Sequence, residues 1–97
     1  MTSVEIRRVE TNKKQYLALL LLADEQEDMI DRYLERGSMY VLEDDGVKAE
    51  CVVTDEGGGV LELKNIAVEP DFQGKGYGKA LVDFLIRTYA GQYMLLQ

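Results

Sequence analysis

The chain reads LKNIAVEPDFQGKGYGKAL from Leu63 to Leu81, an apolar strand followed by a glycine-rich loop and a helix. Pro70 ends the strand, and glycines stand at positions 74, 76 and 78. A strand that leads into a helix start presents unpaired backbone N–H groups and the positive end of the helix dipole. Because glycine lacks a Cβ and permits positive φ, such a loop can approach a phosphate closely. The pattern predicts a pyrophosphate site, and a plain connection without a ligand is the alternative.

The spacing excludes two common phosphate-binding motifs. A dinucleotide fingerprint requires glycine three residues after Gly76, where this chain has Lys79. A P-loop requires Gly-Lys followed by Ser or Thr, but Gly74-Lys75 precedes Gly76 and Gly78-Lys79 precedes Ala80. The loop therefore binds phosphate, if at all, in a third way.

The residues before this stretch predict one strand, two helices and a three-stranded meander. We expect a strand over residues 4–9 and a helix capped by Thr11 that carries Tyr16, Leu17, Leu20 and Leu21. Asp24 and Glu27 have the spacing of a capping box for a second helix, with Gly37 as its terminator. The second helix places four residues on one face as core: Met29, Ile30, Tyr33 and Leu34.

The meander and the crossover complete the predicted order. Its strands are Met39–Leu42, residues 47–54 and Val60–Val68, with Asp45-Gly46 as the first turn. A helix follows the glycine-rich loop, and Tyr93–Leu96 begins one more strand. The fold class is α+β (mixed α/β), β-α-α-β-β-β-α-β, with a mostly antiparallel sheet. A strand–helix–strand crossover makes Tyr93–Leu96 a parallel neighbour of Val60–Val68.

The third meander strand changes phase. Leu61 and Leu63 share a face, whereas Ile66 and Val68 have the opposite parity. An extra residue near Lys64-Asn65 would put all four on one face, so the pattern predicts a β-bulge, a feature that is frequent at active sites. The alternative is a regular central strand with both faces partly buried.

Composition excludes several classes of function. The net charge of −7 argues against a nucleic-acid binder and against an anionic membrane surface as partner. The longest apolar run, residues 17–23, is too short to span a membrane, and the N-terminus lacks a signal core, so we expect a cytoplasmic protein. With no histidine, His-based metal sites and Cys/His catalysis within the chain are excluded, and we expect no metal. Cys51 is expected to be a packed small hydrophobe rather than a nucleophile.

The stretch 63–81 resembles motif A of the GCN5-related N-acetyltransferases, the GNAT family. That motif is Arg/Gln-x-x-Gly-x-Gly/Ala, and Gln73, Gly76 and Gly78 match it position for position. The order of elements before it matches as well, so the resemblance covers essentially the whole chain.

The resemblance implies acetyl-CoA, or a related acyl-CoA, as co-substrate. Backbone amides of the loop would hold its pyrophosphate, and the main chain of Ile66 and Val68 would pair with its pantetheine arm. The implied cofactor-binding residues are Ile66, Ala67, Val68, Gln73, Gly74, Lys75, Gly76, Tyr77, Gly78 and Lys79. The family also has a bulge in this strand, which agrees with the change of phase.

Glu62 is the candidate catalytic residue, because several family members carry a glutamate base on this strand. An alkylammonium with a pKa near ~10.4 must lose a proton before it attacks a thioester. A backbone N–H near Ile66, freed by the bulge, would polarise the thioester carbonyl. The alternative for Glu62 is an exposed strand residue paired with a neighbouring Lys or Arg. The acidic residues Glu25, Glu27, Asp28 and Asp31 form either a solvated face or an acidic lip for a cationic amine.

The family continues beyond this point through a helix and two strands, which usually hold a tyrosine acting as general acid. We therefore expect residues 1–97 to be one GNAT-like domain truncated at its C-terminus. A homodimer or a C-terminal segment would cover the apolar strand Tyr93–Leu96. The expected function is transfer of an acetyl group from acetyl-CoA to a small-molecule or peptide amine. The alternatives are an acyl-CoA-binding or sensing module without turnover, and a non-catalytic interaction protein.

Overall fold

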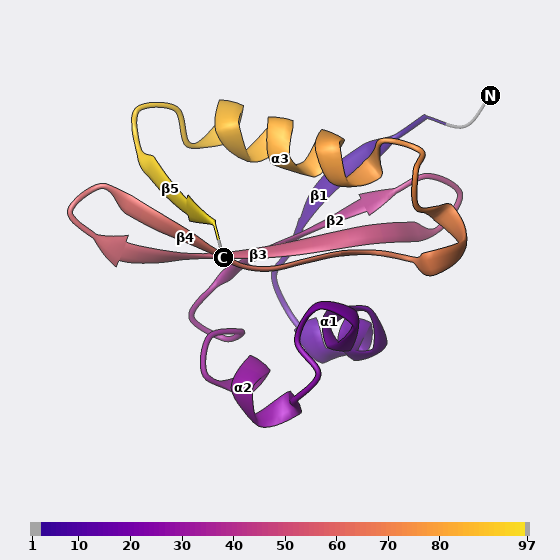
Figure 1. Ribbon diagram of the computed structural model, residues 1–97, viewed down its shortest axis with the longest axis horizontal. Helices are drawn as coiled ribbons and strands as arrows, with labels where there is room; N and C mark the ends of the chain where they lie inside the picture. Colours follow the sequence, from indigo (N-terminus) through magenta and orange to yellow (C-terminus); the bar gives the residue numbers. More distant parts are fainter. Residues whose placement is uncertain (1–2, 97) are drawn as a thin grey trace.

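A computed structural model describes residues 3–96, which form one five-stranded sheet with helices on both faces (Figure 1). The strands lie in the order β1-β2-β3-β4-β5. Strands β1 to β4 are antiparallel, and β5 runs parallel to β4. Their bounds are β1 Glu5–Val9, β2 Ser38–Glu43, β3 Val47–Gly57, β4 Val60–Val68 and β5 Tyr93–Leu96. The predicted fold class, order of elements and parallel pair are confirmed.

The helices separate by face. The helix α3, Tyr77–Thr88, covers one face, whereas α1, Leu17–Ala23, and α2, Glu27–Asp31, lie on the other (Figure 1). Two 3₁₀ turns complete the chain: η1, Lys13–Tyr16, leads into α1, and η2, Pro70–Phe72, follows β4. No helix in the described residues 3–96 is long and apolar enough to cross a membrane.

The α3 face holds a regular apolar core. Leu81 and Leu85 of α3 are 0% and 2% exposed and pack on Tyr40, Cys51 and other residues of β2 to β4. The ring of Tyr40 meets Phe84 edge-on at 5.0 Å, and its hydroxyl shares a 2.6 Å hydrogen bond with the hydroxyl of Tyr89. Burial confirms the structural interpretation of Cys51 and raises the pKa of its thiol.

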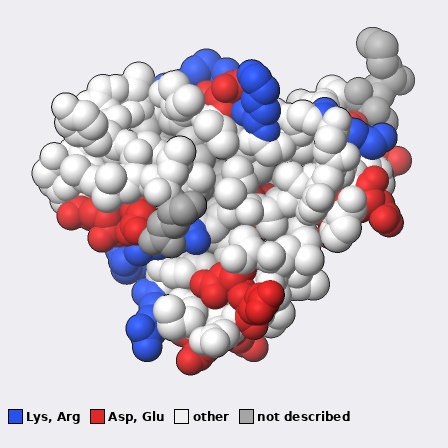
Figure 2. Space-filling view, viewed as in Figure 1, with Lys and Arg blue, Asp and Glu red and all other residues white. Residues whose placement is uncertain are grey.

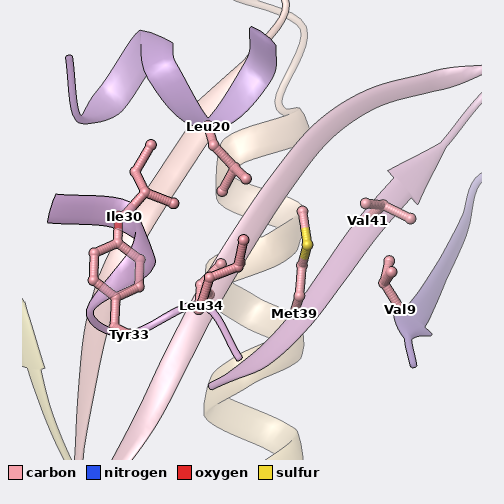
Figure 3. Packing of buried hydrophobic residues seen from close by; sticks show 8 residues of the cluster. Val9, Leu20, Ile30, Tyr33, Leu34, Met39 and Val41 are labelled. Carbon is pink, nitrogen blue, oxygen red and sulfur yellow. The ribbon is translucent and has the colours of Figure 1, made fainter. Parts of the chain in front are cut away.

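The other face is packed by α1, α2 and the turn after α2. Leu20, Ile30, Leu34 and Met39 are at most 2% exposed, and their side chains point toward a shared centre (Figure 3). The end of the α2 region is fastened by Lys13, whose ammonium donates to the carbonyls of Leu34, Glu35 and Gly37 at 2.7–3.2 Å.

The predicted caps of the first two helices are wrong. The chain enters η1 through Asn12, in the left-handed region at φ 51°, and makes no side-chain cap bond. The helix α2 begins after Gln26, again without a side-chain cap bond, so Thr11 caps nothing and Asp24 and Glu27 form no capping box. Tertiary partners use these side chains instead: Asp24 accepts from the Tyr33 hydroxyl, and Glu27 pairs with Lys14.

The second helix is also shorter than its apolar pattern predicts. It ends at Asp31, and residues 32–36 continue as turns. Ile30, Tyr33 and Leu34 are buried as expected, but Met29 is 38% exposed, which corrects its assignment to the core. Gly37 is required by close approach, because an added Cβ would lie 2.7 Å from Val52 Cγ1 and 2.9 Å from the Tyr33 carbonyl.

The strand β5 lies at the edge of the sheet with large apolar side chains exposed. Tyr93, Leu95 and Leu96 are 79%, 53% and 66% exposed. Its pairing with β4 runs from Val60–Tyr93 to Leu63–Leu96. Within the described residues, the edge of β4 from Lys64 to Val68 therefore has no strand on the side of β5.

Candidate functional site

The predicted bulge in β4 is present. Leu63 lies opposite Val53 and Asn65 opposite Val52, so Lys64 is the extra residue. As a result Leu63, Ile66 and Val68 all pack in the core under α3 despite their opposite parity. The bulge lies where the pairing of β4 with β5 stops, so the interrupted backbone faces an open edge.

The glycine-rich loop adopts the conformation that its sequence predicts. Gly74 and Gly76 have φ of 82° and 86°, and an added Cβ at either would meet no atom within 4 Å. The space in front of both glycines is therefore open. Gly76 is the N-cap of α3, whose first turn leaves backbone N–H groups without helical partners. This is the geometry of an anion site that uses main-chain donors.

Side chains tie the loop to the strands around it. The amide of Gln73 donates to the carbonyl of Val68 at 3.3 Å. The hydroxyl of Tyr77 donates to Asp44 at 2.5 Å, which joins the start of α3 to the β2–β3 turn and raises the pKa of Tyr77. Lys79 pairs with Asp83 at 2.8 Å, and the Lys75 ammonium lies 5.8 Å from the centre of the Phe72 ring. The backbone donors are thus held in place while both lysine charges stay near the loop.

A hollow of about 350 Å³ lies along the free edge of β4, and we call it the strand-edge hollow. It is lined by Leu22, Ile66, Ala67, Val68, Gln73, Gly78 and Val82. Five of the ten predicted cofactor-binding residues meet there. The lining comes from the strand, the loop and one helix of each face, so only the folded chain assembles it.

Two further hollows continue past the bulge on the side of α1 and α2. The bulge hollow, about 340 Å³, is lined by Ala23, Leu63, Lys64, Asn65 and Ile66. The arginine hollow, about 250 Å³, is lined by Asp24, Met29, Arg32, Tyr33, Arg36 and Lys64. Ile66 is shared by the first two hollows and Lys64 by the last two. Figure 2 has the orientation of Figure 1, with α3 above the sheet and α1 and α2 below it, and it shows charged side chains in clusters on a largely uncharged surface.

Glu62 does not line the strand-edge hollow. It lies on β4 two residues before Lys64, and its carboxylate pairs with the Lys64 ammonium at 2.5 Å. The two side chains are only 16% and 19% exposed. The pairing agrees with the alternative interpretation of Glu62, but the low exposure of its side chain does not, and its role as a base stays a prediction.

The acidic run in and just before α2 is exposed, as both interpretations of it require. Glu25, Glu27, Asp28 and Asp31 are all exposed. Lys14 pairs with Glu27 at 2.7 Å and with Asp31 at 2.6 Å, so part of this charge is already compensated. No group of three or more acidic or cysteine side chains suited to a metal ion occurs among residues 3–96.

A buried polar group beside the bulge escaped the sequence analysis. Asn65, 3% exposed, donates to the Leu20 carbonyl and to the Tyr33 hydroxyl, both at 3.0 Å. Tyr33 in turn donates to Asp24 at 3.2 Å. Desolvation raises the pKa of Tyr33 to about 12, so its hydroxyl keeps its proton.

Glu50 belongs to the same face and is fully buried. It lies on β3 between Val41 of β2 and Ala67 of β4. Burial raises its pKa to about 8 from an ordinary value of 4.5. Neither of its oxygens has a hydrogen-bond partner, and the side-chain oxygen of Asn65 also lacks one. The signal in the sequence was one carboxylate within the apolar run AECVV, which period 2 places on the face of Val52.

The chain matches the family described as "Acetyltransferase (GNAT) domain" over residues 35–96. A curated relative, "Uncharacterized N-acetyltransferase YvbK" of Bacillus subtilis (strain 168), is 43% identical over 74 residues. That match covers 75% of this chain and 47% of the relative, so the chain spans about half the length of this relative.

Two solved structures are similar over nearly the whole chain. The "IAA acetyltransferase" of Bacillus cereus is 39% identical with a TM-score of 0.81, and the match covers 92% of this chain and 59% of that one. A GNAT acetyltransferase of Elizabethkingia anophelis, solved with acetyl-CoA bound, is 28% identical with a TM-score of 0.87. That match covers 96% of this chain and 63% of the other. Each of these matches thus covers more than nine-tenths of this chain.

Proposed function

The chain belongs to the GNAT family of acetyltransferases, and on this basis we propose that it binds acetyl-CoA along β4 and serves transfer of the acetyl group to a primary amine. The observation that carries the proposal is the bulge at Lys64 next to the strand-edge hollow. Next to the bulge lie the open edge of β4, the strand-edge hollow and the start of α3, whose first backbone N–H groups have no helical partner.

Each part of the hollow fits a different part of the cofactor. The N–H groups of residues 74–79 offer donors for a pyrophosphate, and the open space in front of Gly74 and Gly76 admits it. The edge of β4 at Ile66, Ala67 and Val68 offers main-chain groups to an extended pantetheine arm, as in addition of a strand to a sheet. Gln73 and Tyr77 hold the loop in position, and Lys75 and Lys79 supply positive charge.

The chain's own residues then act on the amine. Acetyl-CoA supplies the activated acetyl group as a thioester. A backbone N–H at the bulge, near Ile66, stabilises negative charge on the carbonyl oxygen. Glu62 accepts the ammonium proton, directly or through a water, so that the amine nitrogen is free to form its new bond to carbon. Lys64 holds the Glu62 carboxylate in position through their ion pair.

The wider context of the site also stays a proposal. We propose that residues 1–97 form one GNAT-like domain that lacks the C-terminal elements of the family. The match covers 59% of the Bacillus cereus structure, and elements like those in the rest of it would complete the wall of the acceptor site. A second copy or such elements would cover the exposed side chains of Tyr93, Leu95 and Leu96. The proposed acceptor is a small-molecule or peptide amine.

Calorimetric titration with CoA, combined with detection of released thiol over a panel of amines, tests the function. We expect Glu62→Gln to lower turnover by about 10²–10⁴-fold and to leave the affinity for acetyl-CoA unchanged, because the carboxylate serves the amine. The loss shrinks at high pH, where more of the amine is neutral. Glu43→Gln, at an exposed ion pair with Arg7, is the matched control.

The same variant separates catalysis from sensing. A sensing module binds CoA and tolerates Glu62→Gln without functional change. A chain that binds no CoA is neither an acetyltransferase nor a sensor, and its glycine-rich loop is then only a connection.

A further inference from the structure

Most of the basic side chains bind a carboxylate, a carbonyl oxygen or an aromatic ring of the chain itself. Within residues 3–96 the exceptions are Arg32 and Arg87, whose guanidinium groups have no such partner. Arg87 lies in the last turn of α3 and lines none of the hollows described above. Arg32 directly follows α2 and lines the arginine hollow. In a chain of net charge −7, an arginine in a hollow without a carboxylate partner is suited to bind an anion from outside the chain.

The other charged residues of the arginine hollow are already engaged. Arg36 and Lys64 each pair with a glutamate, at 3.3 Å and 2.5 Å. Asp24 is the one carboxylate that lines the hollow, and it accepts a hydrogen bond from the Tyr33 hydroxyl at 3.2 Å. The N–H donors of Arg32 are therefore the charged donors that the hollow leaves unused. A planar guanidinium binds a carboxylate through two parallel N–H groups, so a carboxylate is the ligand that fits them best.

The arginine hollow is open to a ligand. The side chain of Arg32 is exposed, and the hollow has a volume of about 250 Å³. The backbone N–H of Arg32 donates to the carbonyl of Met29 at 3.2 Å, which holds the start of this side chain in place at the end of α2. The site thus combines an accessible guanidinium with a fixed backbone.

The three hollows follow one another along β4. The strand-edge hollow and the bulge hollow share Ile66, and the bulge hollow and the arginine hollow share Lys64. With the pyrophosphate at the glycine-rich loop and the thioester near Ile66, an acceptor approaches from the other side of the bulge. The walls of the bulge hollow at Ala23, Leu63 and Ile66 suit an alkyl chain. A molecule that places its amine near Ile66 and extends away from the loop therefore brings its far end to the arginine hollow.

We propose that the arginine hollow binds a carboxylate of the acceptor and that Arg32 is the residue that holds it. The acceptor is then an amino carboxylate, with its amine near Ile66 and its carboxylate on the Arg32 guanidinium. This rests on the proposed function, because it names a substrate class for the same site. The hollow favours such acceptors over alkylamines, which lack the anion. It also favours them over diamines, whose second ammonium would meet the positive charges of Arg32, Arg36 and Lys64.

The direct test observes the Arg32 guanidinium by ¹⁵N NMR in the CoA-saturated protein. Its Nε–H signal is assigned through its loss in Arg32→Gln. The probes are glycine, 4-aminobutyrate and 6-aminohexanoate, whose amine and carboxylate stand at increasing separations, and n-butylammonium chloride is the control without a carboxylate. A bound carboxylate draws the guanidinium protons into short hydrogen bonds, so we expect at least one amino carboxylate, and not n-butylammonium, to shift this signal.

Calorimetric titration of CoA-saturated variants then measures the affinity for the best of the three probes. We expect Arg32→Gln to weaken it by about tenfold, as for a lost charge-assisted hydrogen bond, and to leave the affinity for CoA unchanged. Arg32→Lys retains the charge without the paired donors and should lose less. Arg87→Gln removes the other arginine without a partner and is the matched control, with wild-type affinity expected. An unmoved Arg32 signal with all three amino carboxylates, or equal affinity in Arg32→Gln, overturns the proposal.

The outcomes also separate this inference from the proposed function. CoA binding and release of thiol with alkylamines, without any response of Arg32 to the amino carboxylates, leave the function standing and remove the carboxylate site. A response of Arg32 in a chain that binds no CoA leaves a carboxylate site and removes the acetyltransferase.

Discussion

The two faces of the sheet are both covered by helices, but they bury different kinds of residue. Under α3, a regular helix of 12 residues covers an apolar core in which the hydroxyls of Tyr40 and Tyr89 satisfy each other by a hydrogen bond. Under α1 and α2, shorter helices cover a core that contains Glu50 and Asn65. Polar groups of this kind lower stability unless a partner satisfies them. The difference indicates that the α3 face holds the fold and positions the loop, whereas the α1 face carries buried polar groups at a cost in stability.

The largest expected effect tests the loop at the start of α3. Gly76→Val places a β-branched residue at φ 86° and puts its side chain into the open space in front of the loop. We expect CoA affinity to fall by more than about 100-fold, because the side chain occupies the pyrophosphate position. Calorimetric titration measures the loss. Gly91→Val, at φ 89° and also facing open space, carries the same backbone strain away from the loop and should bind CoA normally. Binding by Gly76→Val within about threefold of wild type would contradict the assignment, since such a change is only about 0.65 kcal/mol.

The second effect tests whether the α3 face holds the fold. Leu81 is 0% exposed, and Leu81→Ala leaves a cavity in the core under α3. We expect the free energy of unfolding to fall by about 4 kcal/mol, measured by urea denaturation. Met29→Ala, at the exposed methionine of α2, should change it by less than about 0.5 kcal/mol. Similar losses in the two variants would remove the distinction between the faces.

The third effect tests the cost of the buried carboxyl on the α1 face. The pKa of Glu50 is raised from 4.5 to about 8, so the folded state retains a proton that the unfolded state has released between these values. The stability of the wild type should therefore fall as pH rises through this window and level off above it. Glu50→Gln has no titrating carboxyl at this position. The free energy of unfolding of the variant relative to the wild type should therefore rise by on the order of 3 kcal/mol between pH 5 and pH 8.

Urea denaturation at the two pH values measures the third effect. The exposed Glu43 pairs with Arg7, and Glu43→Gln should show no comparable growth. If the stability difference between Glu50→Gln and the wild type is the same at both pH values, Glu50 does not cause the pH dependence of stability.

The smallest expected effect concerns the tie between the loop and the β2–β3 turn. Tyr77→Phe removes the hydrogen bond to Asp44 and should cost about 1 kcal/mol of stability, with a loss of CoA affinity of a few fold. Asp44→Asn retains an acceptor and should lose less. Thermal denaturation and calorimetric titration measure both variants. A loss of stability in Tyr77→Phe as large as that in Leu81→Ala would contradict this prediction, because the hydrogen bond would then contribute as much as a buried core side chain.

The helical residues before β2 show why sequence patterns misplaced the caps. Asp24 and Glu27 have the spacing of a capping box, but Asp24 binds Tyr33 and Glu27 binds Lys14. These partners lie 9 and 13 residues away in the chain, so local spacing does not reveal them. Met29 fits the apolar face of a long helix, but α2 ends at Asp31 and leaves it exposed.

The sequence by itself determined the features that depend on local geometry. The order of strands and helices follows from hydrophobic period, the bulge from a change of parity in β4, and the loop conformation from its glycines. Only the tertiary structure decided which residues from distant parts of the chain come into contact. The strand-edge hollow takes residues from α1, β4, the loop and α3, and the contact of Asn65 with Leu20 joins positions 45 residues apart. The burial of Glu50 likewise depends on the packing around β3, where β2 and β4 flank it, because desolvation is a property of the packed surroundings and not of the residue alone.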